Sequence, residues 1–330
     1  GRLAALYAIR DRVVAGEVSP EEGLRQVRAV LAEGGGAALA DVAGQALVGG
    51  GAAALLGGGV TEVWVAAVAG VLAAWVALLA RRRPSLGDVQ AALTCAVVAF
   101  FVRAVATVWP LNVPVTTLAA IIVLLPGLSF TTALAELAMR HLAAGSARLM
   151  GALAVFVTMA IGVGIGDRTA AQLFGEVAPP PPAALGTLAL TLALAANWVA
   201  FVLLLRGTPR QAPWVLFAVL AGFGGARTGA ALLGDDLGAV VGAMAVGALA
   251  NLYARFWRQP SAIVRTPGLL LLVPGSLGFS GLTTALSGDL DSSAPFVIRM
   301  LLVGGSIVAG LLFAGAVLPP PLAVEPAQRD

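Results

Sequence analysis

Two segments of this sequence combine a Pro-Gly pair with nearby hydroxyl side chains. Leu124–Leu134 reads LLPGLSFTTAL and Leu272–Leu286 reads LVPGSLGFSGLTTAL, and the two prolines are 148 residues apart. A proline inside an apolar helix removes a backbone hydrogen bond and kinks or ends the helix, at a cost of about 3 kcal/mol. Paired Gly/Pro interruptions at matching positions of two membrane halves indicate a solute site between discontinuous helices.

A helix that begins after each Pro-Gly pair would present unpaired backbone N–H groups and the positive end of its dipole to an anion. Such a break can bind the carboxylate of a small solute, while hydroxyl and amide groups bind its other polar groups. For each hydroxyl, the alternative is a hydrogen bond to the carbonyl one turn earlier in its own helix. The predicted substrate-binding residues of this kind are Pro126, Gly127, Ser129, Thr131, Thr132, Pro274, Gly275, Ser276, Thr283, Thr284, Asn112, Thr116, Thr117 and Asn251, with Asn197 offering the same chemistry.

Three arginines, Arg103, Arg227 and Arg299, fall within apolar runs. An arginine at the middle of a bilayer costs about 2.5–3.5 kcal/mol on insertion scales, so it usually faces the protein interior and marks a pathway or an ion pair. We therefore expect Arg103 and Arg227 to contact substrate, and Arg299 to lie near a membrane interface. The alternative for Arg103 is a structural salt bridge to Asp41 or Glu136, or a side chain that reaches the outer surface.

Two acidic residues, Asp41 and Glu136, are predicted to carry a coupling proton or to bind an ammonium group. Asp41 shares a helix face with Gln45, four residues later, but lies only about one turn into its span. A hydrated carboxylate at the membrane interface is therefore the alternative. Glu136 follows the first Pro-Gly pair on a segment with helical spacing, and its alternative is a solvated helix face.

The composition indicates a lipid environment. Hydrophobic residues make up 59% of the chain and charged residues 11%, against about 25% charged residues in a soluble domain. All 20 basic residues are arginine, so the chain has no lysine for a phosphate loop or a Schiff base. A single cysteine, Cys95, and a single histidine, His141, cannot form a disulfide or a Cys/His zinc cluster. We expect no cofactor, no metal site, no nucleic-acid binding and no enzymatic activity.

Ten apolar runs approach the roughly 20 residues that a membrane-spanning helix needs. The fourth and ninth are short and end at the Pro-Gly pairs, which predicts an all-α polytopic membrane protein with broken fourth and ninth helices. Five spans in each half would make the halves inverted repeats. The runs lie near residues 37–57, 60–80, 89–109, 112–128, 147–166, 184–205, 213–233, 237–257, 262–280 and 296–317.

Arginines between the runs gather on one predicted side of the membrane, which places the N- and C-termini in the cytoplasm by the positive-inside rule. Proline-rich sequence divides the two halves and reads as a stiff external linker. The expected domains are cytoplasmic amphipathic helices at 1–35, five-helix membrane repeats at 36–166 and 184–320, the linker at 167–183 and a cytoplasmic tail at 321–330.

Several motifs together resemble the threonine/serine exporter family. They are the amphipathic N-terminal segment, a Gly-rich first span, LLPG followed by LSFTTALAEL and GSARL in the first half, and LLVPGSLGF in the second. The resemblance covers essentially the whole chain and corresponds to a fused two-domain form. It implies a ten-helix exporter of small hydroxy amino acids in the bacterial inner membrane, driven by proton exchange. It also assigns the binding site to the two Pro-Gly pairs and the polar residues beside them.

Other functions stay open at this point. The apolar runs contain three arginines and few acidic residues. This excess of positive charge suits a small mono- or dicarboxylate substrate such as succinate equally well. A non-transporting scaffold subunit is a further alternative, although it would not need two matched breaks with polar residues after each. The expected partners are a small-molecule substrate, protons and the lipid bilayer, and a homo-oligomer is compatible with the sequence. For a transporter, we expect one repeat to rock against the other around a midplane site.

Overall fold

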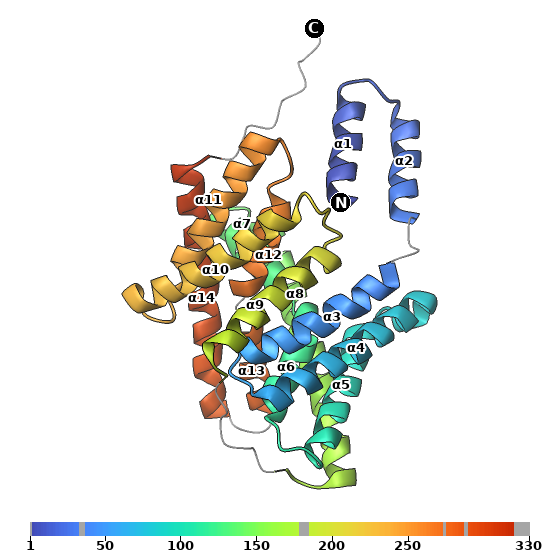
Figure 1. Cartoon of the computed structure of the whole chain (residues 1–330), viewed down its shortest axis with the longest axis vertical. Coiled ribbons are helices and arrows are strands. Elements are labelled where there is room, and N and C mark those ends of the chain that lie inside the picture. Colours follow the sequence, from blue (N-terminus) through green and yellow to red (C-terminus); the bar gives the residue numbers. More distant parts are fainter. Residues whose placement is uncertain (1, 33–36, 178–184, 273–274, 287–289, 320–330) are drawn as a thin grey trace.

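The structure is a computed structural model that describes residues 2–32, 37–177, 185–272, 275–286 and 290–319, and every regular element in these ranges is a helix (Figure 1). The α-helices are α1 (Arg2–Val14), α2 (Pro20–Ala32), α3 (Ala37–Leu55), α4 (Val60–Arg82), α5 (Gln90–Ala106), α6 (Val113–Ile121), α7 (Gly127–Ala138), α8 (Leu142–Phe174), α9 (Thr187–Leu204), α10 (Ala212–Leu233), α11 (Ala239–Trp257), α12 (Ala262–Leu272), α13 (Gly275–Leu286) and α14 (Leu290–Val317). Two short 3-10 helices are η1 (Pro84–Leu86) and η2 (Ile122–Leu124).

The helices place small residues inside and large apolar residues outside. On α9, Ala193 and Ala200 are buried, whereas Leu188 and Leu192 are 74% and 62% exposed. Small residues let membrane helices approach closely, and large apolar side chains are stable where lipid surrounds them. Within the described residues, eight helices are long and apolar enough to span a membrane, or nine if the bent pair described below counts as one span.

The expected fold class, an all-α polytopic membrane protein, is confirmed. The count of ten spans stays a prediction, because α5 has only 17 residues and the fourth span is divided. One predicted boundary was wrong: α8 does not end near residue 166 but continues through Asp167 and Arg168 to Phe174, where Gly175 takes a φ of 87°. Helix-compatible polar residues extend a helix beyond the apolar run that hydropathy detects.

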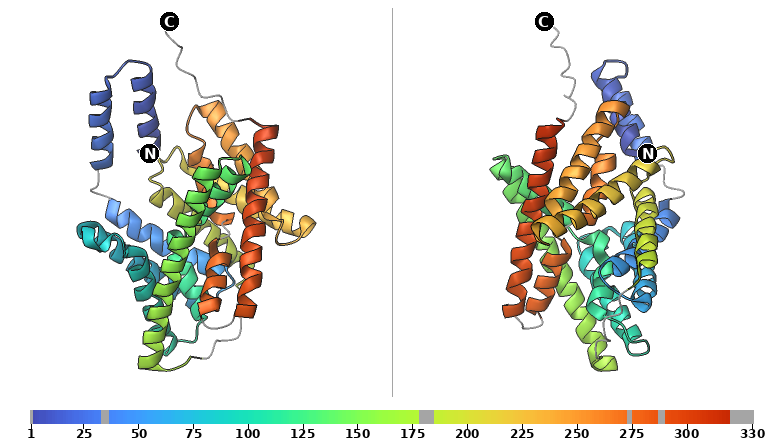
Figure 2. Two further views of the ribbon diagram at one scale, coloured as in Figure 1. Left: turned by 180° about the vertical axis from the view of Figure 1, so that it is seen from behind. Right: turned by 60° about the vertical axis from the view of Figure 1, so that its left-hand side comes forward.

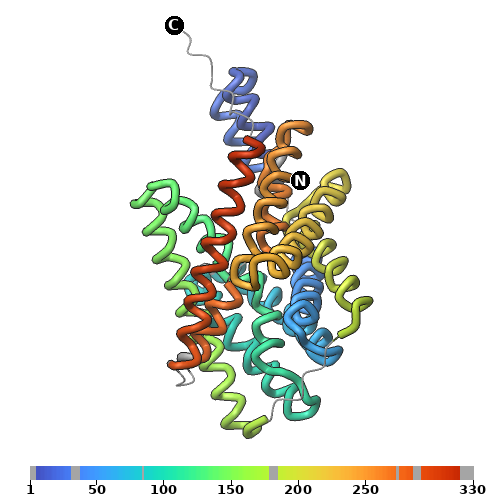
Figure 3. The backbone as a smooth tube through the Cα atoms, turned by 90° about the vertical axis from the view of Figure 1, so that its left-hand side faces the viewer, coloured from blue at the N-terminus to red at the C-terminus, as the bar shows by residue number. Residues whose placement is uncertain are grey.

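The same pairs of elements pack against each other in the two halves of the chain. Helix α5 packs on α8 as α11 packs on α14, α7 packs on α8 as α13 packs on α14, and α4 packs on α6 as α10 packs on α12. Between the halves, α3 packs along α9, and the contact of α8 with α13 is matched by that of α14 with α7. The end of α14 and the α1–α2 hairpin lie at one end of the molecule, and the end of α8 lies at the other (Figures 2 and 3).

The first Pro-Gly pair breaks its helix as predicted. The side chain of Asn112 accepts a hydrogen bond from the Val115 amide at 3.1 Å and so caps α6. After η2, Pro126 cannot donate a backbone hydrogen bond, and α7 begins at Gly127 in a direction bent by 62°. In the second half, α12 ends at Leu272 and α13 begins at Gly275, while the predicted site residue Pro274 lies outside the described residues.

Candidate functional site

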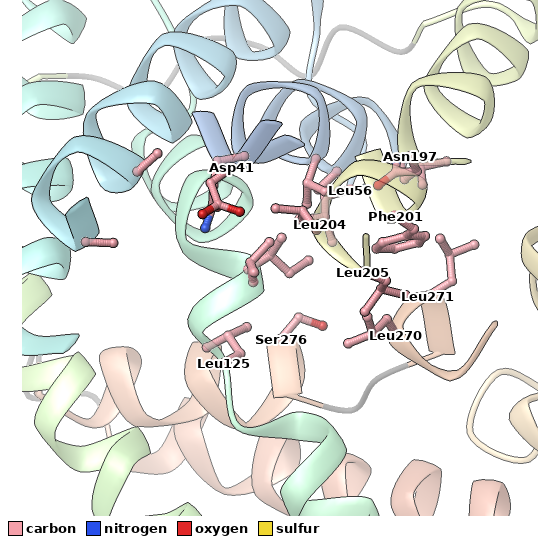
Figure 4. A pocket seen from close by; sticks show the side chains of 18 of the residues that line it. Asp41, Leu56, Leu125, Asn197, Phe201, Leu204, Leu205, Leu270, Leu271 and Ser276 are labelled. Carbon is pink, nitrogen blue, oxygen red and sulfur yellow. The ribbon is translucent and has the colours of Figure 1, made fainter. Parts of the chain in front are cut away.

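A cavity of about 500 Å³ lies between α3, α4, α9, α12 and the start of α13 (Figure 4). We refer to it as the Asp41 cavity. Its volume is within the range of about 300–1,000 Å³ that is typical of small-molecule sites. Most of its lining is leucine, alanine, valine and phenylalanine, and its polar lining residues are Asp41, Gln45, Arg81, Asn197 and Ser276.

Asp41 forms ion pairs with two arginines from other elements. Its carboxylate accepts from Arg81 at the end of α4, at 2.9 Å, and from Arg206 just after α9, at 2.5 Å. The Asp41 side chain is only 16% exposed, so water screens these pairs less than it would at an open surface. The pairs tie the first turns of α3 to α4 and to the end of α9. Asp41 and Gln45 share a helix face, as the sequence predicted, and both line the cavity.

The Asp41 cavity reaches both Pro-Gly breaks. Leu125 directly precedes Pro126 and lines the cavity, and so does Ser276, the second residue of α13. Figure 4 shows the side chains of Asp41 and Ser276 on opposite walls of the same space. Ser276 is therefore a predicted break hydroxyl that borders a solute-sized cavity.

A second cavity, of about 970 Å³, lies between α5, α6, α8, α13 and the start of α14. We refer to it as the Arg103 cavity. It is also mainly apolar, and its polar lining residues are Arg103, Thr117, Asp167, Arg168, Ser280, Thr283 and Thr284.

Arg103 is 9% exposed and pairs with acids that the sequence did not suggest. Its Nη1 donates to both Asp167 oxygens, at 3.2 and 3.3 Å, and its Nη2 donates to Glu176 at 2.6 Å and to the Gly175 carbonyl at 3.4 Å. The predicted alternative of a salt bridge from Arg103 to Asp41 or Glu136 was wrong. The reason is that α5 packs along α8, whose C-terminal part carries Asp167.

Four of the eight predicted hydroxyl groups bind within their own helices. Thr116 donates to the Asn112 carbonyl at 2.8 Å, Thr131 to Gly127 at 2.9 Å, Thr132 to Leu128 at 2.8 Å and Thr283 to Phe279 at 3.1 Å. For these four threonines the structure therefore has the alternative arrangement. Ser129 is exposed on α7.

Thr117 differs from its neighbour Thr116. It is 3% exposed and lines the Arg103 cavity, and its Oγ1 has no hydrogen-bond partner among the described residues. The Nε of Arg103 is likewise buried without a partner in this part of the chain. A buried polar atom without a partner carries a desolvation cost of about 1–3 kcal/mol, so both atoms are suited to bond to a small polar ligand in this cavity.

Other predicted residues lie outside the linings of both cavities. Asn112 caps α6, and Asn251 donates to the Leu318 carbonyl at 2.7 Å. Glu136 pairs with Arg148 at 3.0 Å, which ties α7 to α8. These contacts give the two asparagines and Glu136 structural partners.

The expectation that Arg227 faces the protein interior was wrong. Its side chain is exposed on α10, with the guanidinium 5.2 Å from the centre of the Phe223 ring. A cation over an aromatic ring is stabilised without an acidic partner, and a long side chain can direct its charge toward the membrane surface. Arg299 pairs with Asp236 at 2.7 Å.

Sequence reasoning missed the buried acid Glu62. It is 6% exposed, and its two oxygens accept from the amides of Gly59 at 2.9 Å and Asn112 at 2.8 Å. The available signal was its place at the third position of α4, where a Glu side chain reaches back to the amide before the helix. Glu62 thus joins the start of α4 to the start of α6.

A thin apolar layer separates the two cavities. Along α6 and η2, Thr117 and Leu118 line the Arg103 cavity, whereas Ile122 and Val123 line the Asp41 cavity. Ile121 lies between them, is fully buried and lines neither cavity. The four-residue step from Leu118 to Ile122 corresponds to about 6 Å of helix rise.

Helix α13 passes through the same layer from the second half of the chain. Ser276 lines the Asp41 cavity, and Phe279 and Ser280 line the Arg103 cavity. Leu277 lines neither of them and packs in the same hydrophobic cluster as Ile121. Ile121 and Leu277, one from each half, therefore belong to the layer between the cavities.

The fold and these cavities define a multi-pass helical membrane protein with solute-sized cavities on both sides of an apolar layer close to the helix breaks. The chain belongs to the threonine/serine exporter family, because a family model of that description matches residues 1–169 and a second, "Threonine/Serine exporter, ThrE", matches residues 191–317. Members of this family are membrane exporters and not enzymes. An uncharacterized protein of Schizosaccharomyces pombe is 25% identical over 189 residues, which are 53% of this chain and 21% of that protein. No solved structure matches the chain.

Proposed function

We propose that the protein is a secondary active exporter of threonine and serine that works by alternating access around the two helix breaks. The observation that carries the proposal is the pair of cavities separated by one apolar layer, with Leu125 and Ser276 bordering the Asp41 cavity beside the breaks. A scaffold subunit would not need two matched helix breaks beside such a cavity. Family membership and the matched helix pairs of the two halves support the same function.

In the proposed topology the Asp41 cavity is the cytoplasmic vestibule and the Arg103 cavity is the external one. The distribution of arginines in the sequence supports this orientation, with both termini in the cytoplasm of a bacterial inner membrane. The two halves are inverted repeats in this scheme, and one rocks against the other. Rocking separates Ile121 from Leu277 and opens the layer to one side at a time.

Each part of a hydroxy amino acid has a matching group at the proposed site. The amides at the starts of α7 and α13, from Gly127 and Gly275, suit the carboxylate. Ser276 suits the side-chain hydroxyl, and Asp41 suits the ammonium group when that group replaces one of its two arginines. Asp41 is the better of the two predicted coupling residues because it lines a cavity, whereas Glu136, which is also paired with an arginine, lines neither cavity. Proton exchange at Asp41 would release the cations bound to its carboxylate.

Export of a small mono- or dicarboxylate is the second candidate. Arginine lines both cavities, with Arg81 in the Asp41 cavity and Arg103 and Arg168 in the Arg103 cavity. A guanidinium can bind a carboxylate through two parallel hydrogen bonds. A solute with two carboxylates would therefore find a partner on each side of the layer.

Counterflow in proteoliposomes tests the proposal. Vesicles containing the purified protein are loaded with unlabelled threonine, serine or succinate and offered the labelled solute, with and without an inward proton gradient. We expect threonine and serine uptake that responds to the gradient. Uptake of succinate alone would replace the substrate and keep the site. Absence of uptake of all three by folded protein would contradict transport of these solutes.

A further inference from the structure

We propose that Glu176 is an intramolecular competitor for the carboxylate of the transported solute. Its carboxylate is bound to Arg103 at the position that the solute's carboxylate takes in the external vestibule. This inference rests on the proposed function, because both the threonine class and the alternative succinate class carry a carboxylate. It adds a residue outside the membrane helices to the site and a step that controls release.

The hydrogen bonds of Arg103 leave one edge of its guanidinium partly used. Nη1 is bound by Asp167, and Nη2 receives one oxygen of Glu176 at 2.6 Å. Nε, which shares an edge with Nη2, has no partner among the described residues. A free carboxylate can bind both nitrogens of such an edge through parallel hydrogen bonds, which one oxygen of Glu176 does not do.

Thr117 provides a second sign that this cavity binds a polar ligand. It lines the same cavity, is 3% exposed and has an Oγ1 without a hydrogen-bond partner in the part of the chain that the structure describes. Buried hydroxyls are usually bonded to protein or to an ordered molecule. A small solute bound in the Arg103 cavity could bond to this hydroxyl with one of its own polar groups.

Glu176 adds a second carboxylate to Arg103. Asp167 lines the cavity together with Arg103, whereas Glu176 is not among the lining residues and reaches Arg103 from the chain that follows α8. When Glu176 leaves, Arg103 keeps Asp167 as a partner and can accept the carboxylate of a solute.

The two acids bound to Arg103 are not equally easy to displace. Asp167 lies inside α8, is 33% exposed and contributes both oxygens. Glu176 is 90% exposed and lies two residues beyond the end of α8, after Gly175 with its φ of 87°. An exposed ion pair on irregular backbone contributes little to stability, so Glu176 is the partner that a solute carboxylate would replace.

Binding measurements on the full chain test this exchange. Labelled L-threonine and labelled succinate are titrated separately against purified protein in detergent, for wild type, Glu176→Gln and the control Asp291→Asn. Asp291 is another exposed acid, in the first turn of α14. We expect Glu176→Gln to bind the carboxylate ligand about 2- to 5-fold more tightly, as expected for loss of an exposed competing ion pair. Asp291→Asn should bind as wild type does.

Variants of Arg103 complete the test. In the Glu176→Gln background, Arg103→Gln should abolish the increase in ligand affinity. The double change Arg103→Gln/Asp167→Asn tests the same effect and avoids leaving the Asp167 carboxylate without its arginine. Tighter succinate binding with no threonine binding would support the competitor role and reject threonine as substrate. Threonine binding that is unaffected by Glu176→Gln and Arg103→Gln would overturn the competitor role and leave the proposed function in place. Absence of binding of both ligands to folded Glu176→Gln would also overturn it.

Discussion

Replacement of Gly166 by alanine should separate α5 from α8 and disturb the Arg103 ion pairs. A Cβ atom at Gly166 would overlap the Ala96 carbonyl oxygen and lie 2.8 Å from the Ala96 carbonyl carbon. Ordinary contact begins at 3.4 Å, so the two helix backbones must move apart by more than half an ångström. Overpacking of this kind costs about 1–3 kcal/mol, against about 1 kcal/mol gained from alanine's higher helix propensity.

The functional effect follows from what the two helices carry. Arg103 lies on α5, and Asp167 directly follows Gly166 on α8, so separation lengthens contacts that are already 3.2 and 3.3 Å long. We expect Gly166→Ala to lower the thermal unfolding temperature in detergent and to reduce counterflow at least severalfold. Gly151→Ala on the same helix is the matched control, because nothing lies within 4 Å of a Cβ there. Equal stability and equal counterflow in both variants would refute the reasoning.

Three further changes test other contacts. Glu62→Ala removes a buried acceptor of two backbone N–H groups and should lower the free energy of unfolding by about 2–3 kcal/mol, measured by denaturation in detergent; no loss would contradict this role. Asp41→Asn should abolish the response of counterflow to a proton gradient, and an unchanged response would exclude Asp41 as the coupling residue. A bismaleimide cross-link between Ile122→Cys and Leu271→Cys, made with Cys95→Ser, should stop counterflow, and undiminished flux would reject rocking of the two halves.

Much of the fold could be predicted from the lengths of apolar runs. The predicted spans at 60–80 and 213–233 agree closely with α4 (Val60–Arg82) and α10 (Ala212–Leu233). Pro126 also marked the first break. A proline lacks the backbone N–H that a helix needs, and this effect does not depend on how the helices pack. The length of α8 could not be predicted in this way, because hydropathy detects the part of a helix that suits lipid and not the end of its hydrogen bonds.

The site was less predictable because its residues depend on how helices pack. Thr116 and Thr117 are adjacent and identical in type, yet one bonds to its own helix and the other has no partner among the described residues. No local pattern distinguishes them. Similarly, the place of Arg103 within an apolar run could be read from the sequence, but its pairing with Asp167 arises from the packing of α5 on α8. The sequence therefore predicted which polar side chains lie in apolar helices, but not which groups they bond to.

Each cavity holds an acid–arginine cluster with which a zwitterion can exchange partners, because Asp41 pairs with Arg81 and Arg206 whereas Arg103 pairs with Asp167 and Glu176. On the proposed topology, the cytoplasmic vestibule holds a carboxylate, Asp41, and the external vestibule holds a guanidinium, Arg103. An amino acid that crosses the layer with its ammonium group near Asp41 directs its carboxylate toward Arg103, where Glu176 is the group to be displaced. We therefore expect the carboxylate of an exported amino acid to reach the external vestibule before its ammonium group. A dicarboxylate has no group that suits Asp41, so it must use Arg81 and Arg206 instead.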